Sequence, residues 1–168
     1  MHYLLKNNYL LLTVLLLIIN TGCKVQSKFD RDYPEYTAEK NTVEAYEMSN
    51  DSTTLYLGMT AQKKSYGRSP ENPIFLGVTN HHEGGKNRMR FLNALELEDG
   101  SPVVYERLKS CCPFKTLNSA TIGADQKYGL LDVWLVYPEG QPDKADTLYI
   151  NAYDQGSPMV PKGYKAKQ

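Results

Sequence analysis

Cysteine, histidine and tryptophan are scarce in this chain of 168 residues, which has three cysteines, three histidines and one tryptophan. The GxSxG, HExxH and Walker phosphate-loop patterns are also absent from it. These absences exclude the usual signatures of serine hydrolases, zinc proteases and nucleotide-binding enzymes. The sequence therefore shows neither whether this protein is an enzyme nor which reaction it would catalyse.

An excess of positive charge is missing as well. The chain has 19 basic and 19 acidic side chains, mixed along its length. Lys6 is the single charged side chain among residues 1–22. Without this segment, 18 of the 19 basic side chains remain against 19 acidic ones, a net charge of 18 − 19 = −1. A nucleic-acid-binding domain typically has a basic face and a high pI. We therefore expect no nucleic acid partner.

The N-terminus has the layout of a bacterial export signal. A polar start is followed by an apolar run from Tyr9 to Ile19 and then by "NTGC". As a helix this run would extend roughly 17 Å, short of the ~30 Å that a membrane-spanning helix crosses. The sequence predicts a lipoprotein signal over 1–22 and lipidation of Cys23 by acyl chains such as palmitate. Asn20 departs from the usual leucine, and the alternative is an ordinary signal with Cys23 incidental.

The next segment, residues 23–52, is polar, charged and poor in large aliphatic residues. Such a composition cannot bury enough apolar area to order its own backbone. We expect a tether that lifts the domain off the bilayer, with a short helix near Ala38–Met48. The folded domain is then predicted over 53–168.

Within 53–168, hydrophobic periodicity predicts one helix and several strands. The helix is expected at Asn87–Leu97, where Met89 and Leu92 have helical spacing. The strands are expected at Thr53–Met59, at Ile74–Thr79, at the start of "SPVVYERLKSC", in "GLLDVWLVYPEG" and in "DTLYINAYDQG". One helix followed by antiparallel strands indicates a single small α+β domain in which an antiparallel sheet packs against that helix.

Two groups of titratable residues are candidates for chemistry. In "NHHEGG", His81, His82 and Glu83 are of metal-ligand type, but adjacent side chains in an extended segment point to opposite faces. A solvated loop is the competing interpretation. Acidic residues such as Glu106, Asp132 and Asp154 suit acid–base work, although they are far apart in the sequence and equally suit a solvated surface. We expect no metal and no cofactor.

Cys111 and Cys112 are adjacent, and once Cys23 is lipidated they have only each other as partners. Pro113 favours an extended backbone at Cys112, which turns neighbouring side chains apart. Neighbouring Cα atoms also lie closer together, at ~3.8 Å, than in most disulfides. We expect a structural role at a strand end with at least one thiol buried against the sheet. A vicinal disulfide and a thiol-based redox pair remain alternatives.

Four stretches resemble a family of small Bacteroidetes-type lipoproteins of unknown function. They are "YGRSPENPIFLGV", "RMRFLNALELEDGSPVVYERLKSCCPFKT", "GLLDVWLVYPEG" and "TLYINAYDQGSPMVPKGY". The "SCCPF" core is the most specific. The resemblance implies a lipid-anchored envelope protein and supplies no catalytic residues. Some relatives are labelled 2-dehydro-3-deoxyphosphooctonate aldolase, an enzyme whose TIM barrel typically needs about 250 residues in eight βα units.

These observations together favour a lipid-anchored protein of the cell envelope. We expect the outer rather than the inner membrane, with the domain facing the periplasm or the cell surface. The expected role is a non-enzymatic binding or structural module whose partner is an envelope protein or a small ligand. The alternative is an enzyme, either the aldolase or a thiol-based redox protein.

Overall fold

A computed structural model describes residues 46–50, 52–77, 83–116, 118 and 128–167, all of which lie in one compact unit, Tyr33–Gln168. In these residues it has one α-helix, α3 (Gly84–Asn93), and a short 3-10 helix, Pro142–Lys144. The strands are β1 (Ile74–Phe75), β2 (Leu95–Leu97), β3 (Val103–Lys115), β4 (Tyr128–Pro138), β5 (Asp146–Asn151) and β6 (Tyr164–Ala166).

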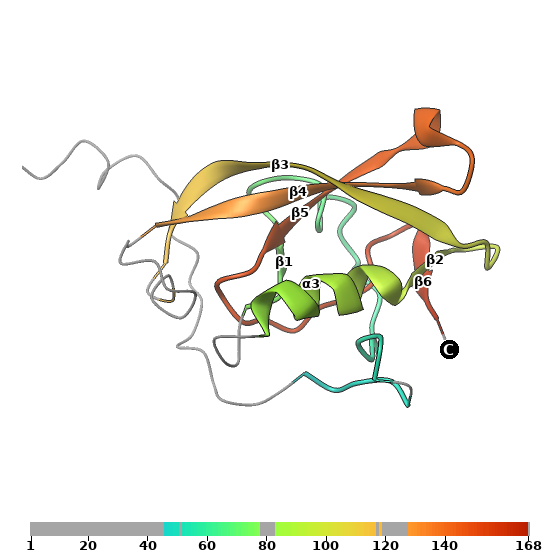
Figure 1. The fold of residues 1–168 in the computed structure, drawn as a ribbon, viewed down its shortest axis with the longest axis horizontal. Helices are drawn as coiled ribbons and strands as arrows, with labels where there is room; N and C mark the ends of the chain where they lie inside the picture. The colour runs from blue at the N-terminus through green and yellow to red at the C-terminus, as the bar shows by residue number, and fades with distance from the viewer. Residues whose placement is uncertain (1–45, 51, 78–82, 117, 119–127, 168) are drawn as a thin grey trace, which may run out of the picture. The chain divides into compact units, whose positions relative to one another are not determined.

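The main sheet has four strands in the order β1-β5-β4-β3, and β2 pairs with β6 in a second, smaller sheet. Strands β3, β4 and β5 are antiparallel neighbours, whereas β1 runs parallel to β5. Helix α3 lies beneath the main sheet (Figure 1). The predicted α+β class with one packed helix is therefore confirmed, but the sheet is mixed rather than wholly antiparallel.

The hydrophobic core fills the space between the helix and the sheet. Phe91 and Leu92 from α3 are fully buried together with Leu148 and Ile150 from β5. Strand β4 contributes Trp134 and Val136 on the same face, two residues apart, as the alternation of a strand requires. Burial of large side chains of this kind stabilises the fold by roughly 1.5–3 kcal/mol each.

The helix begins three residues before the predicted Asn87 and ends four residues before the predicted Leu97. Leu95, Glu96 and Leu97 pair instead with β6, where Leu97 lies opposite Tyr164. Leucine and glutamate are good helix formers, so local propensity favoured a longer helix. Pairing with a strand about seventy residues further along the chain, as the register shows, overrides that weak local preference.

The strand predicted at Thr53–Met59 does not form. Leu55 and Leu57 are buried, so the predicted alternation is present, but within the segment only Leu55 forms a bridge, with Met48. Thr60, directly after the segment, forms a second isolated bridge with Val160. The strand predicted at Ile74–Thr79 is shorter than expected. Of its residues, only those of β1 pair with β5, and Leu76 adds one isolated bridge to Gln155. Residues 78–79 of the predicted strand lie outside the described part.

The packed region begins before the expected boundary at Thr53. Tyr46 and Met48 pack against the core, and the Tyr46 hydroxyl links the end of β1 to the loop after β5. This hydroxyl donates to the Phe75 carbonyl at 3.5 Å and accepts from the Gly156 amide at 3.4 Å. Burial raises the pKa of Tyr46 to about 12. The segment predicted as tether thus includes residues that belong to the domain, and residues 46–48 are not helical.

Candidate functional site

Of the candidate site residues predicted from the sequence, some lie in the described part of the structure and some do not. Cys23, His81 and His82 lie outside the described residues. Glu83 directly precedes α3 and accepts a hydrogen bond from Arg90 at 2.6 Å, which lowers the pKa of its carboxyl. Among the described residues no cluster of three His, Cys, Asp or Glu side chains has metal-ligand geometry.

Cys111 and Cys112 form a vicinal disulfide. They lie inside β3 rather than at its end, and both are partly exposed rather than buried. The ladder to β4 shifts register between Cys111 and Pro113, and Cys112 has a φ of 55°. The expected extended backbone at Cys112 is therefore wrong. The left-handed conformation brings the two neighbouring side chains to the same side, where an extended backbone would separate them.

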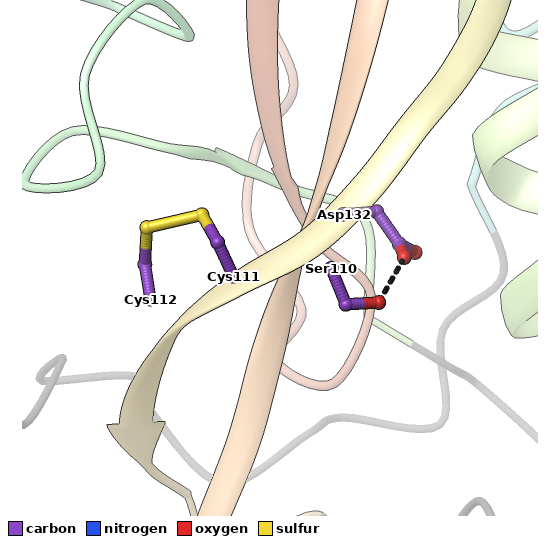
Figure 2. The surroundings of a disulfide bond; sticks show 4 residues. All are labelled: Ser110, Cys111, Cys112 and Asp132. Atoms are coloured by element: carbon purple, nitrogen blue, oxygen red, sulfur yellow. Dashed lines mark hydrogen bonds between the residues drawn. A yellow bond between two sulfur atoms is a disulfide. The ribbon is translucent and has the colours of Figure 1, made fainter.

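A charged cluster lies on the other side of β3 from the disulfide. Figure 2 shows Ser110, next to Cys111, with its side chain directed toward Asp132 of β4. The Ser110 hydroxyl is 3.5 Å from Asp132 Oδ1. Arg107 donates to the same carboxylate oxygen from Nε at 3.0 Å and from Nη2 at 2.7 Å. Arg88 of α3 forms an ion pair with Asp132 Oδ2.

The arginine cluster, defined as Arg88, Arg107 and Asp132, has more positive than negative charge. Asp132 is buried, at 5% exposure, and its single charge faces two guanidinium groups, so the three side chains carry a net charge of +1. Burial lowers the pKa of Arg88, and the nearby charge of Arg107 lowers it further. The side chain of Arg107 is 48% exposed and is open to solvent.

Hydrogen-bond donors also outnumber acceptors in this region. Arg88 Nε and Trp134 Nε1 are buried without a hydrogen-bond partner among the described residues. Trp134 lies two positions after Asp132 on the same face of β4, opposite Arg107 in the β3 ladder. A buried donor left without an acceptor costs roughly 1–3 kcal/mol. The interface between α3 and the sheet is therefore rich in donors.

A second buried polar network is centred on Asp154, just after β5. Its carboxylate accepts hydrogen bonds from Thr116 at 2.6 Å, from Asn118 at 2.7 Å and from Asn151 at 2.9 Å. Its backbone carbonyl accepts from the Gly77 amide at 2.8 Å. All of these donors are neutral. The network joins the segments that follow β3, β5 and β1, and its hydrogen bonds hold these segments together.

The acid–base group suggested by sequence is not brought together by the contacts of Asp132 and Asp154. Glu106 is exposed, while Asp132 and Asp154 are each engaged in a separate network. Sequence reasoning missed Arg88 and Arg107 as the partners of Asp132. One signal was present, because Asp132 interrupts the apolar run "GLLDVWLVYP", and a charge within a buried strand requires a partner.

Surface hollows lined by described residues lie elsewhere. One, of about 420 Å³, is bordered by α3 and by Ser52 and Thr53, and another, of about 380 Å³, lies between Leu97–Pro102 and Pro138–Lys144. Neither is lined by the disulfide or the arginine cluster. We take as the candidate site the stretch of β3 and β4 that carries the disulfide and the arginine cluster.

Comparison with known proteins gives no further assignment. No protein-family model, curated protein sequence or solved structure matches this chain. In the part that the structure describes, none of the helices is long and apolar enough to span a membrane.

Proposed function

We propose that this protein is a lipid-anchored binding module of the cell envelope that takes a small oxyanion at the arginine cluster. The observation that carries the proposal is the pairing of two guanidinium groups with one buried carboxylate. A small oxyanion, such as a carboxylate or a phosphate, supplies the missing negative charge and further acceptor oxygens. Guanidinium groups bind such anions through paired N–H donors.

Access to the site is through Arg107. Its side chain is 48% exposed, whereas that of Arg88 is 26% exposed. The Ser110 hydroxyl accepts from Arg107 Nη2 at 2.5 Å. Together with Asp132 it fixes the direction of the guanidinium group. A donor held in place in this way loses little conformational entropy when it binds a ligand, which favours affinity.

The binding proposal is tested by titrating the protein with inorganic phosphate and with acetate while following the Arg107 Nε resonance by NMR. We expect saturable binding of at least one of them. Arg107→Gln should weaken it about tenfold, since a hydrogen bond to a charged group contributes roughly 1.5–3 kcal/mol. Lys109→Gln is the matched control, because it removes the same charge from an exposed position of the same strand. Equal weakening by both variants, or no saturation in the wild type, would contradict the proposal.

Membrane anchoring rests on the sequence signal that ends at Cys23. We expect Cys23→Ser to abolish incorporation of a labelled fatty acid and to move the protein from the membrane to the soluble fraction, because the acyl chains contribute ~0.8 kcal/mol per buried CH₂. Cys111→Ser is the control that removes a different cysteine. Absence of label from the wild-type protein would count against the anchor.

A further inference from the structure

We propose that the Cys111–Cys112 disulfide is a site of reversible thiol–disulfide exchange with a dithiol donor, and that its reduction weakens anion binding at the arginine cluster. The exchange reaction stands on the disulfide and its surroundings alone. The effect on anion binding rests on the proposed function.

A stabilising role explains this disulfide poorly. A disulfide stabilises a fold mainly by closing a loop in the unfolded chain, and the effect grows with the length of that loop. Cys111 and Cys112 are one position apart, so their bond closes no loop of intervening residues. Its removal should therefore change the entropy of the unfolded chain very little.

The bond is also accessible to an incoming thiolate. Both cysteines are partly exposed, and the preceding residues of β3 from Glu106 to Ser110 are exposed. Exchange requires that a thiolate reach one sulfur atom of the bond. The position on a solvent-facing stretch of β3 meets this requirement, whereas a disulfide enclosed in the core would not.

The backbone at Cys112 depends on the disulfide. Cys112 and Ser52 are the non-glycine residues with positive φ in the described part of the chain. The left-handed region is unfavourable for a residue with a side chain, by roughly 1–2 kcal/mol. The following Pro113 favours an extended backbone at Cys112. Reduction removes the covalent bond that holds the two side chains together, so we expect Cys112 to move toward the extended region.

This movement reaches the arginine cluster through Ser110. The register shift of β3 lies between Cys111 and Pro113, one residue beyond Ser110. The Ser110 hydroxyl contacts Arg107 at 2.5 Å and Asp132 Oδ1 at 3.5 Å. Since the disulfide and the Ser110 side chain project from opposite sides of β3 (Figure 2), the effect passes through the backbone. A displaced Ser110 leaves the guanidinium of Arg107 less firmly oriented.

The reaction balances without a cofactor bound to this chain. One thiolate of the donor dithiol attacks a sulfur of the pair, the Cys111–Cys112 bond breaks, and a mixed disulfide forms. The second donor thiolate then displaces the cysteine, so the donor leaves as a disulfide. Cys111 and Cys112 together gain two electrons and two protons. An envelope protein with a CxxC motif is a partner of suitable chemistry.

Exchange is tested on the folded, detergent-solubilised full-length protein with reduced thioredoxin as the dithiol probe. We expect thioredoxin to make both cysteines of the 111–112 peptide available to iodoacetamide, as seen by mass spectrometry. The Cys112 Cα resonance should move toward values typical of an extended backbone. If the cysteine pair is reduced only after denaturation, the exchange site is overturned. If the Cys112 Cα resonance stays unchanged on reduction, the backbone movement is overturned.

Coupling is tested by phosphate titration of the oxidised and the reduced wild-type protein. We expect reduction to weaken binding about tenfold, within the range typical of coupled sites. In Ser110→Ala the ratio between the two redox states should approach one, although its disulfide remains reducible. Equal affinity in both states of the wild type refutes the coupling and leaves the proposed function standing. If the oxidised protein binds neither phosphate nor acetate, the proposed function and the coupling fail together. The iodoacetamide experiment then still tests the thiol–disulfide exchange on its own.

Discussion

Replacing Asp132 with asparagine is expected to lower the free energy of unfolding by about 3 kcal/mol, because it leaves two guanidinium groups without their counter-charge. The exchange keeps the volume of the side chain, so the loss reports charge and hydrogen bonding rather than a cavity. Arg88 is only 26% exposed and cannot recover full hydration. Urea denaturation followed by circular dichroism measures the effect.

Asp143→Asn is the matched control for this experiment. Asp143 lies in the exposed 3-10 helix, and an exposed substitution of this kind usually changes stability by less than about 0.5 kcal/mol. Adding Arg107→Gln to Asp132→Asn should restore part of the loss, since it removes one of the two unpaired charges. If both single aspartate variants had the same stability, Asp132 would not hold the helix to the sheet.

Gly77→Ala is expected to destabilise the fold by roughly 3 kcal/mol, since it combines overpacking with the loss of a buried hydrogen bond. A Cβ atom at this position would lie 2.1 Å from the backbone carbon of Asp154 and 2.3 Å from the nitrogen of Gln155. Backbone atoms cannot rotate away as a side chain can. The segments after β1 and β5 must separate, which breaks the 2.8 Å hydrogen bond from Gly77 to Asp154.

Gly85→Ala provides the contrast, because the same change is made where space exists. There the nearest atom to the added Cβ is the flexible end of Arg88, at 3.5 Å. Alanine also favours a helix over glycine, so we expect a gain of about 0.5 kcal/mol. Thermal melting of the two variants beside the wild type separates a steric effect from a general sensitivity to added methyl groups. Similar melting temperatures for both would contradict the close approach at Gly77.

The class of the fold could be predicted because the strongest signals were local. The runs that became β4 and β5 are rich in β-branched and aromatic residues and are bounded by turn residues. The parallel pairing of β1 with β5 could not be predicted from two residues, Ile74 and Phe75. Likewise, Leu95–Leu97 has the local preference of a helix, and only the presence of β6 makes it a strand.

The site was less predictable than the fold. Asp132 could be recognised as a charge within an apolar strand, but its partners are 25 and 44 positions away. No local pattern selects Arg107 and Arg88 from the other basic residues. For the cysteine pair, the preference of a residue before proline pointed to an extended backbone. The disulfide overrides that preference at Cys112, where φ is 55°.

Strand β3 has a further property that follows from its place at the end of the sheet order. Among the described strands it has a neighbour on one side only, β4, so its other side is an open edge. Open edges invite pairing with a second molecule and the growth of intermolecular sheets. The register shifts after Arg107 and Cys111 interrupt the regular row of donors and acceptors, and Pro113 lacks an amide hydrogen. The same irregularity that accommodates the disulfide therefore protects this edge against aggregation.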